Sequence, residues 1–165
     1  MITKLKQILN TLGFRKTTPK FLAIATLVGC TIGYLPGKLV NFLAQTYPSV
    51  APEGLEQLNQ LLAMQDPMLN TILFIMIALI MPILEEVVFR GVLWAGIEKL
   101  TKNVHAVAFT TTALFAIVHM DLLHIIGVFP IGLAFAYLRG YSRSLYPALL
   151  AHIVNNTISI SSAFI

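Results

Sequence analysis

Three ionisable side chains stand within six positions of an otherwise apolar segment: Glu85, Glu86 and Arg90. An ionised side chain at mid-membrane costs about 2.5–3.5 kcal/mol even on lenient insertion scales, so such residues usually serve a function. Glu86 and Arg90 are four apart with the acid first, the favourable order for an ion pair on one helix face. Glu85 lies about 100° around the helix and points elsewhere. Its carboxylate is suited to general-base chemistry, and a structural hydrogen bond to another helix is the alternative.

Two histidines stand at a comparable depth on other apolar segments. Counted along their helices from the ends expected to face the cytoplasm, Glu85 and His119 both lie 15 residues in, about 22 Å, and His152 lies about 13 Å in. His152 shares a helix face with Asn156, and together they offer two hydrogen-bond donors to an oxyanion. Hydrogen bonding between helices is the alternative role for this pair. The spacing predicts that these groups converge inside a helical bundle.

The composition predicts where that bundle lies. The chain has 165 residues, of which 57% are hydrophobic and only 11% charged, and its mean hydropathy is +0.81. A soluble domain is usually about 45–50% apolar and about 25% charged, so this chain has too few charges to cover a soluble surface. We therefore expect an all-α protein, a polytopic transmembrane helical bundle of about five spans.

The expected organisation is one membrane domain, 21–165, that follows a basic cytoplasmic tail, 1–20. Within the domain we expect a first span with a bend near Gly33, an outer loop, and a series of motif-bearing helices, at 21–44, 45–68 and 69–165 respectively. The motif-bearing part is expected to contain helices at 70–100 with a bend at Pro82, at 104–120, at 122–138 with an interruption at Pro130, and at 145–165.

The charge distribution sets the expected orientation and partners. Five Lys and Arg side chains crowd the first 20 residues, where there is no acid, and they account for much of the net charge of +4. Basic residues collect on the cytoplasmic side of membrane proteins, so this bias indicates a cytoplasmic N-terminus and lipid as a partner, without any nucleic acid. The compact size and basic start favour a multi-pass protein of a bacterial inner (plasma) membrane.

Four motifs occur in order, and each lies on an apolar helix: Glu85-Glu86-x-x-x-Arg90, Phe115-x-x-x-His119, Phe129-x-x-Gly132 and His152-x-x-x-Asn156. Together they resemble the CPBP family of intramembrane proteases, also called the Abi or CAAX-protease-like family. The resemblance covers roughly 84–157, a little under half of the chain. It implies an intramembrane endopeptidase that hydrolyses a peptide bond in a membrane-associated or lipid-modified peptide.

The resemblance also implies a role for each motif residue. Glu85 activates the attacking water with the help of His119, while His152 and Asn156 stabilise the oxyanion. Glu86 and Arg90 hold the site together through their ion pair. The remaining positions serve packing, and Gly132 allows a close approach of helices: Phe115, Phe129 and Gly132.

Two questions stay open at this point. Catalysis without a metal is the favoured interpretation, and zinc held by Glu85, His119 and His152 is the alternative. Members of the family commonly have more helices than the five expected here, which favours a homo-oligomer or a partner subunit. Outside the protease class, intramembrane acids and bases also suit a proton-coupled transporter, and a non-catalytic membrane immunity or binding protein is a third alternative.

Overall fold

The computed structural model describes residues 2–47 and 53–161, and this part of the chain is helical without a strand. It is an all-α bundle, as the composition predicted. The elements in chain order are α1 (Ile2–Thr11), α2 (Pro19–Thr31), α3 (Tyr34–Thr46), α4 (Glu53–Ala63), α5 (Pro67–Ile75), the π-helical segment η2 (Met76–Ile80), α6 (Met81–Glu86), the π-helical segment η3 (Val87–Leu93), α7 (Trp94–Leu100), α8 (Val104–Ile117), α9 (Leu122–Ser142) and α10 (Leu145–Ser161).

Within the described residues, three helical stretches are long and apolar enough to cross a membrane: Pro19–Thr46, Pro67–Leu100 and Leu122–Ser142. The sequence predicted about five spans, and α8 and α10 occupy the remaining two positions. With 14 and 17 residues, they reach only about 21 and 26 Å, less than the roughly 30 Å of a bilayer core. The chain is therefore a membrane protein whose two shorter helices depend on packing against the longer ones.

The first span is divided at the predicted bend. Helix α2 ends at Thr31, α3 begins at Tyr34, and Gly33 lies between them. The expected outer loop that follows contains a short helix, α4. Residues 48–52 of this loop, and the last four residues of the expected helix 145–165, lie outside the described part of the chain.

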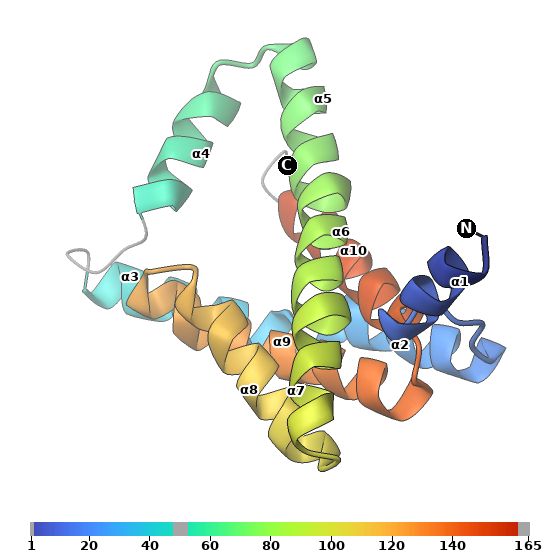
Figure 1. Cartoon of the computed structure of the whole chain (residues 1–165). Helices are drawn as coiled ribbons and strands as arrows, with labels where there is room; N and C mark the ends of the chain where they lie inside the picture. The colour runs from blue at the N-terminus through green and yellow to red at the C-terminus, as the bar shows by residue number, and fades with distance from the viewer. Residues whose placement is uncertain (1, 48–52, 162–165) are drawn as a thin grey trace.

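Segments α5 to α7 form one continuous column of 34 residues (Figure 1, green), which runs across the direction of α2, α3 and α9. Asp66 caps its start, because its side chain accepts hydrogen bonds from the amides of Met68 and Leu69. Two π-helical segments interrupt the α spacing on either side of α6. Each such segment rotates the side chains that follow it around the helix axis, relative to a regular α-helix. Such π-helical segments are frequent at functional sites.

The N-terminal segment is not an isolated tail. It forms α1, a helix that the sequence analysis did not predict, and it is then bonded to the turn before α10: the Leu145 amide donates to Gly13 O at 2.7 Å, and Ser144 Oγ donates to Arg15 O at 2.7 Å. Gly13 has φ +92°, which side chains rarely adopt, and a Cβ there would lie 2.7 Å from Arg139 Nε. Only glycine suits this close approach.

Helix α9 corrects two expectations. It continues through Pro130 instead of being interrupted there, and it extends to Ser142 instead of ending near Leu138. Arg139, which follows the expected end of this helix, is therefore helical and buried. Around α9 the apolar core forms two clusters, one toward α2 and α10 (Ala25, Phe135, Leu138, Ala148 and Ala151) and one toward α7 and α8 (Trp94, Val107, Ala108 and Ala136).

Candidate active site

Glu86 lies at the centre of a buried polar cluster. Its side chain is fully buried, and its Oε1 atom accepts a hydrogen bond from Arg90 Nη1 at 3.0 Å, so the predicted ion pair is present. Arg90 is fully buried too, donates from Nη2 to Gly132 O at 2.8 Å, and places its guanidinium 4.4 Å from the ring centroid of Phe115. These contacts hold α6, α8 and α9 together around one carboxylate.

His152 lies between the two adjacent glutamates. Its Nδ1 atom is 2.9 Å from Glu86 Oε1, and its Nε2 atom is 3.5 Å from Glu85 Oε2. A carboxylate only accepts, so Nδ1 carries the proton and donates it to Glu86. This bond sets the tautomer and orientation of the imidazole, as a carboxylate does for the histidine of a hydrolase triad. The other ring nitrogen then faces Glu85.

Glu85 is the accessible member of the cluster. Its side chain is 21% exposed, whereas that of Glu86 is 0% exposed, although the two residues are adjacent. The predicted separation of the two carboxylates around the helix is therefore confirmed. One carboxylate is engaged by Arg90 and His152, and the other can be reached from outside the bundle.

His119 lies in the turn after α8, and the Phe115 ring contacts both His119 and His152. The Phe115 centroid is 4.9 Å from the His119 ring and 6.1 Å from the His152 ring. His119 donates from Nδ1 to Phe115 O at 2.8 Å, which leaves Nε2 as its acceptor nitrogen. The structure thus brings Glu85 and His152 together and holds His119 beside them.

Of the two residues in the third motif, Gly132 contacts the buried polar cluster and Phe129 does not. A Cβ at Gly132 would lie 2.9 Å from Arg90 Nη2 and 3.0 Å from Phe115 Cδ1, so a glycine is needed there for the arginine to reach the backbone. The sequence predicted a close approach of helices at Gly132, whereas its close neighbours are the side chains of Arg90 and Phe115. Phe129 is not part of the cluster, and its ring packs against Phe109 with centroids 5.4 Å apart.

Asn156 bonds the first π-helical segment. In η2 the Met81 amide donates to Met76 O, five residues back, and the next amide in this series would belong to residue 82. That residue is Pro82, which has no N–H, so its counterpart Ile77 O lacks a helical donor. Asn156 Nδ2 donates to Ile77 O at 3.1 Å. The Asn156 side chain on α10 therefore supplies to Ile77 O the hydrogen bond that Pro82 cannot donate.

Arg139 bonds the second π-helical segment in a similar way. In η3 the Trp94 amide donates to both Gly91 O and Phe89 O, three and five residues back. The next carbonyl along the chain is Arg90 O, and it accepts a hydrogen bond from Arg139 Nε at 3.0 Å. The Arg139 guanidinium also lies 5.5 Å from the Trp94 ring centroid. Side chains from α9 and α10 thus bond a carbonyl in each π-helical segment beside the glutamates.

Sequence reasoning missed several of these contacts. It did not find the bond from His152 to Glu86, because spacing along one helix says nothing about a partner on another. It also did not identify His124 as a neighbour of His119, although the two rings lie 4.7 Å apart. A signal for Arg139 did exist: extending the apolar helical pattern of α9 by one turn would have placed this arginine among buried residues.

The arrangement of possible ligand side chains bears on the zinc alternative. Among the side chains that the structure describes, no three His, Cys, Asp or Glu groups lie together so that they could hold a metal ion. The set considered from sequence, Glu85, His119 and His152, does not form a ligand group here.

Fold and site define a class of protein, a helical membrane protein with an accessible carboxylate beside a buried carboxylate–imidazole pair. A family model described as "Type II CAAX prenyl endopeptidase Rce1-like" matches residues 67–158, more than half of the chain. The chain therefore belongs to the Rce1-like family of CAAX-protease-type endopeptidases. The matched region begins with α5 and contains all four motifs.

A curated relative agrees with this assignment. The chain is 28% identical over 89 residues to a Bacillus subtilis (strain 168) protein described as "Putative membrane peptidase YdiL". The matched part is 54% of this chain and 36% of the Bacillus protein, so the alignment spans about a third of that relative. No solved structure matches the chain.

Proposed function

We propose that the protein is a membrane endopeptidase in which Glu85 activates water to cleave a peptide bond of a membrane-associated or lipid-modified peptide. One observation carries the proposal: Glu85 Oε2 lies 3.5 Å from His152 Nε2 while Glu86 holds the opposite ring nitrogen at 2.9 Å. An accessible base beside an oriented imidazole is the pairing that general acid–base hydrolysis requires. Membership of a CAAX-protease-type family supports the reaction class.

In the proposed reaction Glu85 removes a proton from water as the water oxygen bonds to the substrate carbonyl carbon. The C–N bond then breaks, and Glu85 returns the proton to the leaving amine. His152, protonated at both nitrogens, donates from Nε2 to the oxyanion, and Glu86 stabilises the imidazolium through Nδ1. His119 assists Glu85 electrostatically, and Asn156 supplies a second donor with the amide hydrogen that is not bonded to Ile77 O.

The test uses the full chain in lipid, as wild type and as Glu85→Gln, with a panel of prenylated and unmodified membrane peptides. Products are read by mass spectrometry with and without a chelator. Glu98→Gln is the matched control, because it makes the same change at an exposed position on α7. We expect wild type and Glu98→Gln to cleave, and Glu85→Gln to lose roughly 10²–10⁴-fold, the usual contribution of general acid–base catalysis.

The other outcomes decide the details. Cleavage by Glu85→Gln at the wild-type rate would refute Glu85 as the base. Wild-type cleavage that stops with chelator would refute the metal-free mechanism and favour a metal. If prenylated and unmodified peptides are cut equally well, the protein does not recognise the lipid modification.

A further inference from the structure

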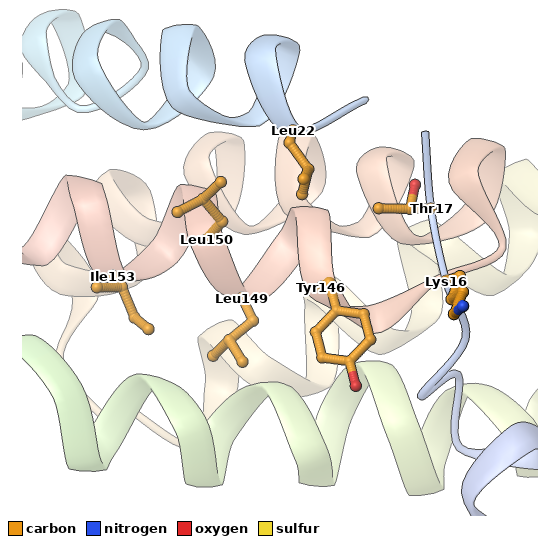
Figure 2. A pocket seen from close by; sticks show the side chains of 7 residues that line it. All are labelled: Lys16, Thr17, Leu22, Tyr146, Leu149, Leu150 and Ile153. Atoms are coloured by element: carbon orange, nitrogen blue, oxygen red, sulfur yellow. The ribbon is translucent and has the colours of Figure 1, made fainter. Parts of the chain in front are cut away.

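A groove runs along the side of α10 that does not contribute to the Glu85 cluster (Figure 2). Its volume is about 510 Å³, within the range of small-molecule sites. The lining comes from α10, from the start of α2 and from the segment before it: Lys16, Thr17, Leu22, Tyr146, Leu149, Leu150 and Ile153. From Tyr146 to Ile153 it follows α10 for about 10 Å.

The polar groups of the groove lie toward one end. Lys16 is exposed, and within the described part of the chain its side chain makes no hydrogen bond or ion pair. Thr17 Oγ1 is buried without a hydrogen-bond partner. Leu149, Leu150 and Ile153 line the remaining length with hydrocarbon (Figure 2). The groove therefore offers a cation and a free hydroxyl at one end and an apolar channel beyond them.

The charged end of the groove is held in place. Leu145 N donates to Gly13 O and Ser144 Oγ donates to Arg15 O, both at 2.7 Å, so the segment before Lys16 is bonded to the turn before α10. The Phe14 ring packs edge-on against Tyr146 with centroids 6.1 Å apart. Lys16 and Tyr146 thus keep a defined relation, and the groove is built by the fold.

We propose that this groove binds one anionic phospholipid, with the phosphate at Lys16 and an acyl chain along Leu149 and Ile153. A hydrocarbon chain needs no hydrogen bonds, whereas a peptide backbone would bring N–H and C=O groups that these apolar walls cannot satisfy. The first 20 residues contain five basic side chains and no acid, which complements a negative headgroup. The proposal does not depend on the protease chemistry.

Native mass spectrometry of the full chain in detergent tests this proposal, with phosphatidylglycerol and phosphatidylcholine of identical acyl chains as probes. Wild type is expected to retain one phosphatidylglycerol. Lys16→Gln should weaken that binding about fivefold, the effect of one surface cation on an anionic lipid, and leave phosphatidylcholine unaffected. Leu149→Trp fills the channel and should abolish retention. The controls, Lys4→Gln and Leu27→Trp, change the same residue types at exposed positions outside the groove lining and should bind as wild type.

A second measurement needs no variant. Phosphatidylglycerol with a photoreactive group on its acyl chain is cross-linked to wild-type protein, and labelled peptides are mapped. Labelling concentrated on 149–153 supports the proposal. Labelling spread over the lipid-facing surface, equal retention of both phospholipids, or displacement of phosphatidylglycerol by a farnesylated peptide would overturn it, and the last outcome would assign the groove to a lipid-modified substrate.

Discussion

The two faces of α10 meet their neighbours in different ways. His152 and Asn156 point to the long column, where each makes a directional hydrogen bond with a defined partner atom. Ala151 and Asn155, one position earlier on the helix, point to α2 and meet a seam of glycines. Both pairs have a spacing of four residues, so each occupies a single stripe of the helix.

The glycine seam, formed by Gly29 and Gly33, requires that the backbones of these segments lie close to α10. A Cβ at Gly29 would lie 2.6 Å from Ala151 O and 2.8 Å from Val154 Cβ, and one at Gly33 would collide with Asn155 Oδ1. Gly29 and Gly33 form a small-xxx-small pattern, which lets membrane helices approach closely and pack by van der Waals contact. The same helix therefore uses shape on one side and polar chemistry on the other. Close packing against Gly29 and Gly33 sets the position of α10, and the hydrogen bonds on the other face set the orientation of its side chains.

The largest expected effect concerns the polar face. Arg90→Met leaves the buried Glu86 carboxylate without its cation and Gly132 O without its donor, which should cost about 3–5 kcal/mol of unfolding free energy. Denaturant unfolding in detergent measures this loss, with the exposed Arg143→Met as control. The double variant Glu86→Leu/Arg90→Met should regain part of the stability but not activity. If Arg90→Met is as stable as Arg143→Met, the ion pair is not important for the fold.

The seam should show a smaller loss. Gly29→Ala places a methyl against backbone, which cannot move easily, and should cost about 1–3 kcal/mol of unfolding free energy. Gly37→Ala is the control, since a Cβ there would have nothing within 4 Å. Similar unfolding free energies for the two variants would contradict a close α2–α10 contact.

Asn156 provides a double-mutant cycle. Asn156→Leu leaves Ile77 O without a donor and should cost about 0.5–1.5 kcal/mol of unfolding free energy. In a Pro82→Ala background the new amide can bond to Ile77 O, so the same substitution should cost less. An equal cost in both backgrounds would refute the complementarity. Loss of cleavage that persists in the Pro82→Ala background would separate a catalytic role from this structural one.

The smallest change in unfolding free energy is expected at Asn155, the residue before Asn156. Asn155 Nδ2 donates to Asn156 Oδ1 at a long 3.4 Å, so Asn155→Ala should change the unfolding free energy by no more than about 0.5 kcal/mol. The same substitution makes room at Gly33, and Gly33→Ala should be better tolerated in the Asn155→Ala background than alone. If Asn155→Ala lowers the unfolding free energy more than Asn156→Leu does, the hydrogen bond of Asn156 is not the more important of the two contacts.

Much of the fold followed from local pattern. The apolar stretches located the helices, Gly33 located the division between α2 and α3, and a spacing of four located the ion pair of Glu86 with Arg90. Helix α1 was missed because a basic segment was taken as a tail. Pro130 was overestimated as a breaker, because α9 continues through it.

The sequence by itself determined that this is a helical membrane protein and that Glu86 and Arg90 lie in its interior, since the cost of placing charge in lipid is a property of composition and helical spacing. It also separated Glu85 from Glu86 around one helix. Only the tertiary structure decided which partners those residues have: that His152 joins the two carboxylates, and that Asn156 and Arg139 bond carbonyls in the π-helical segments. These contacts join helices far apart in the chain, and their geometry depends on helix packing, which no local spacing specifies.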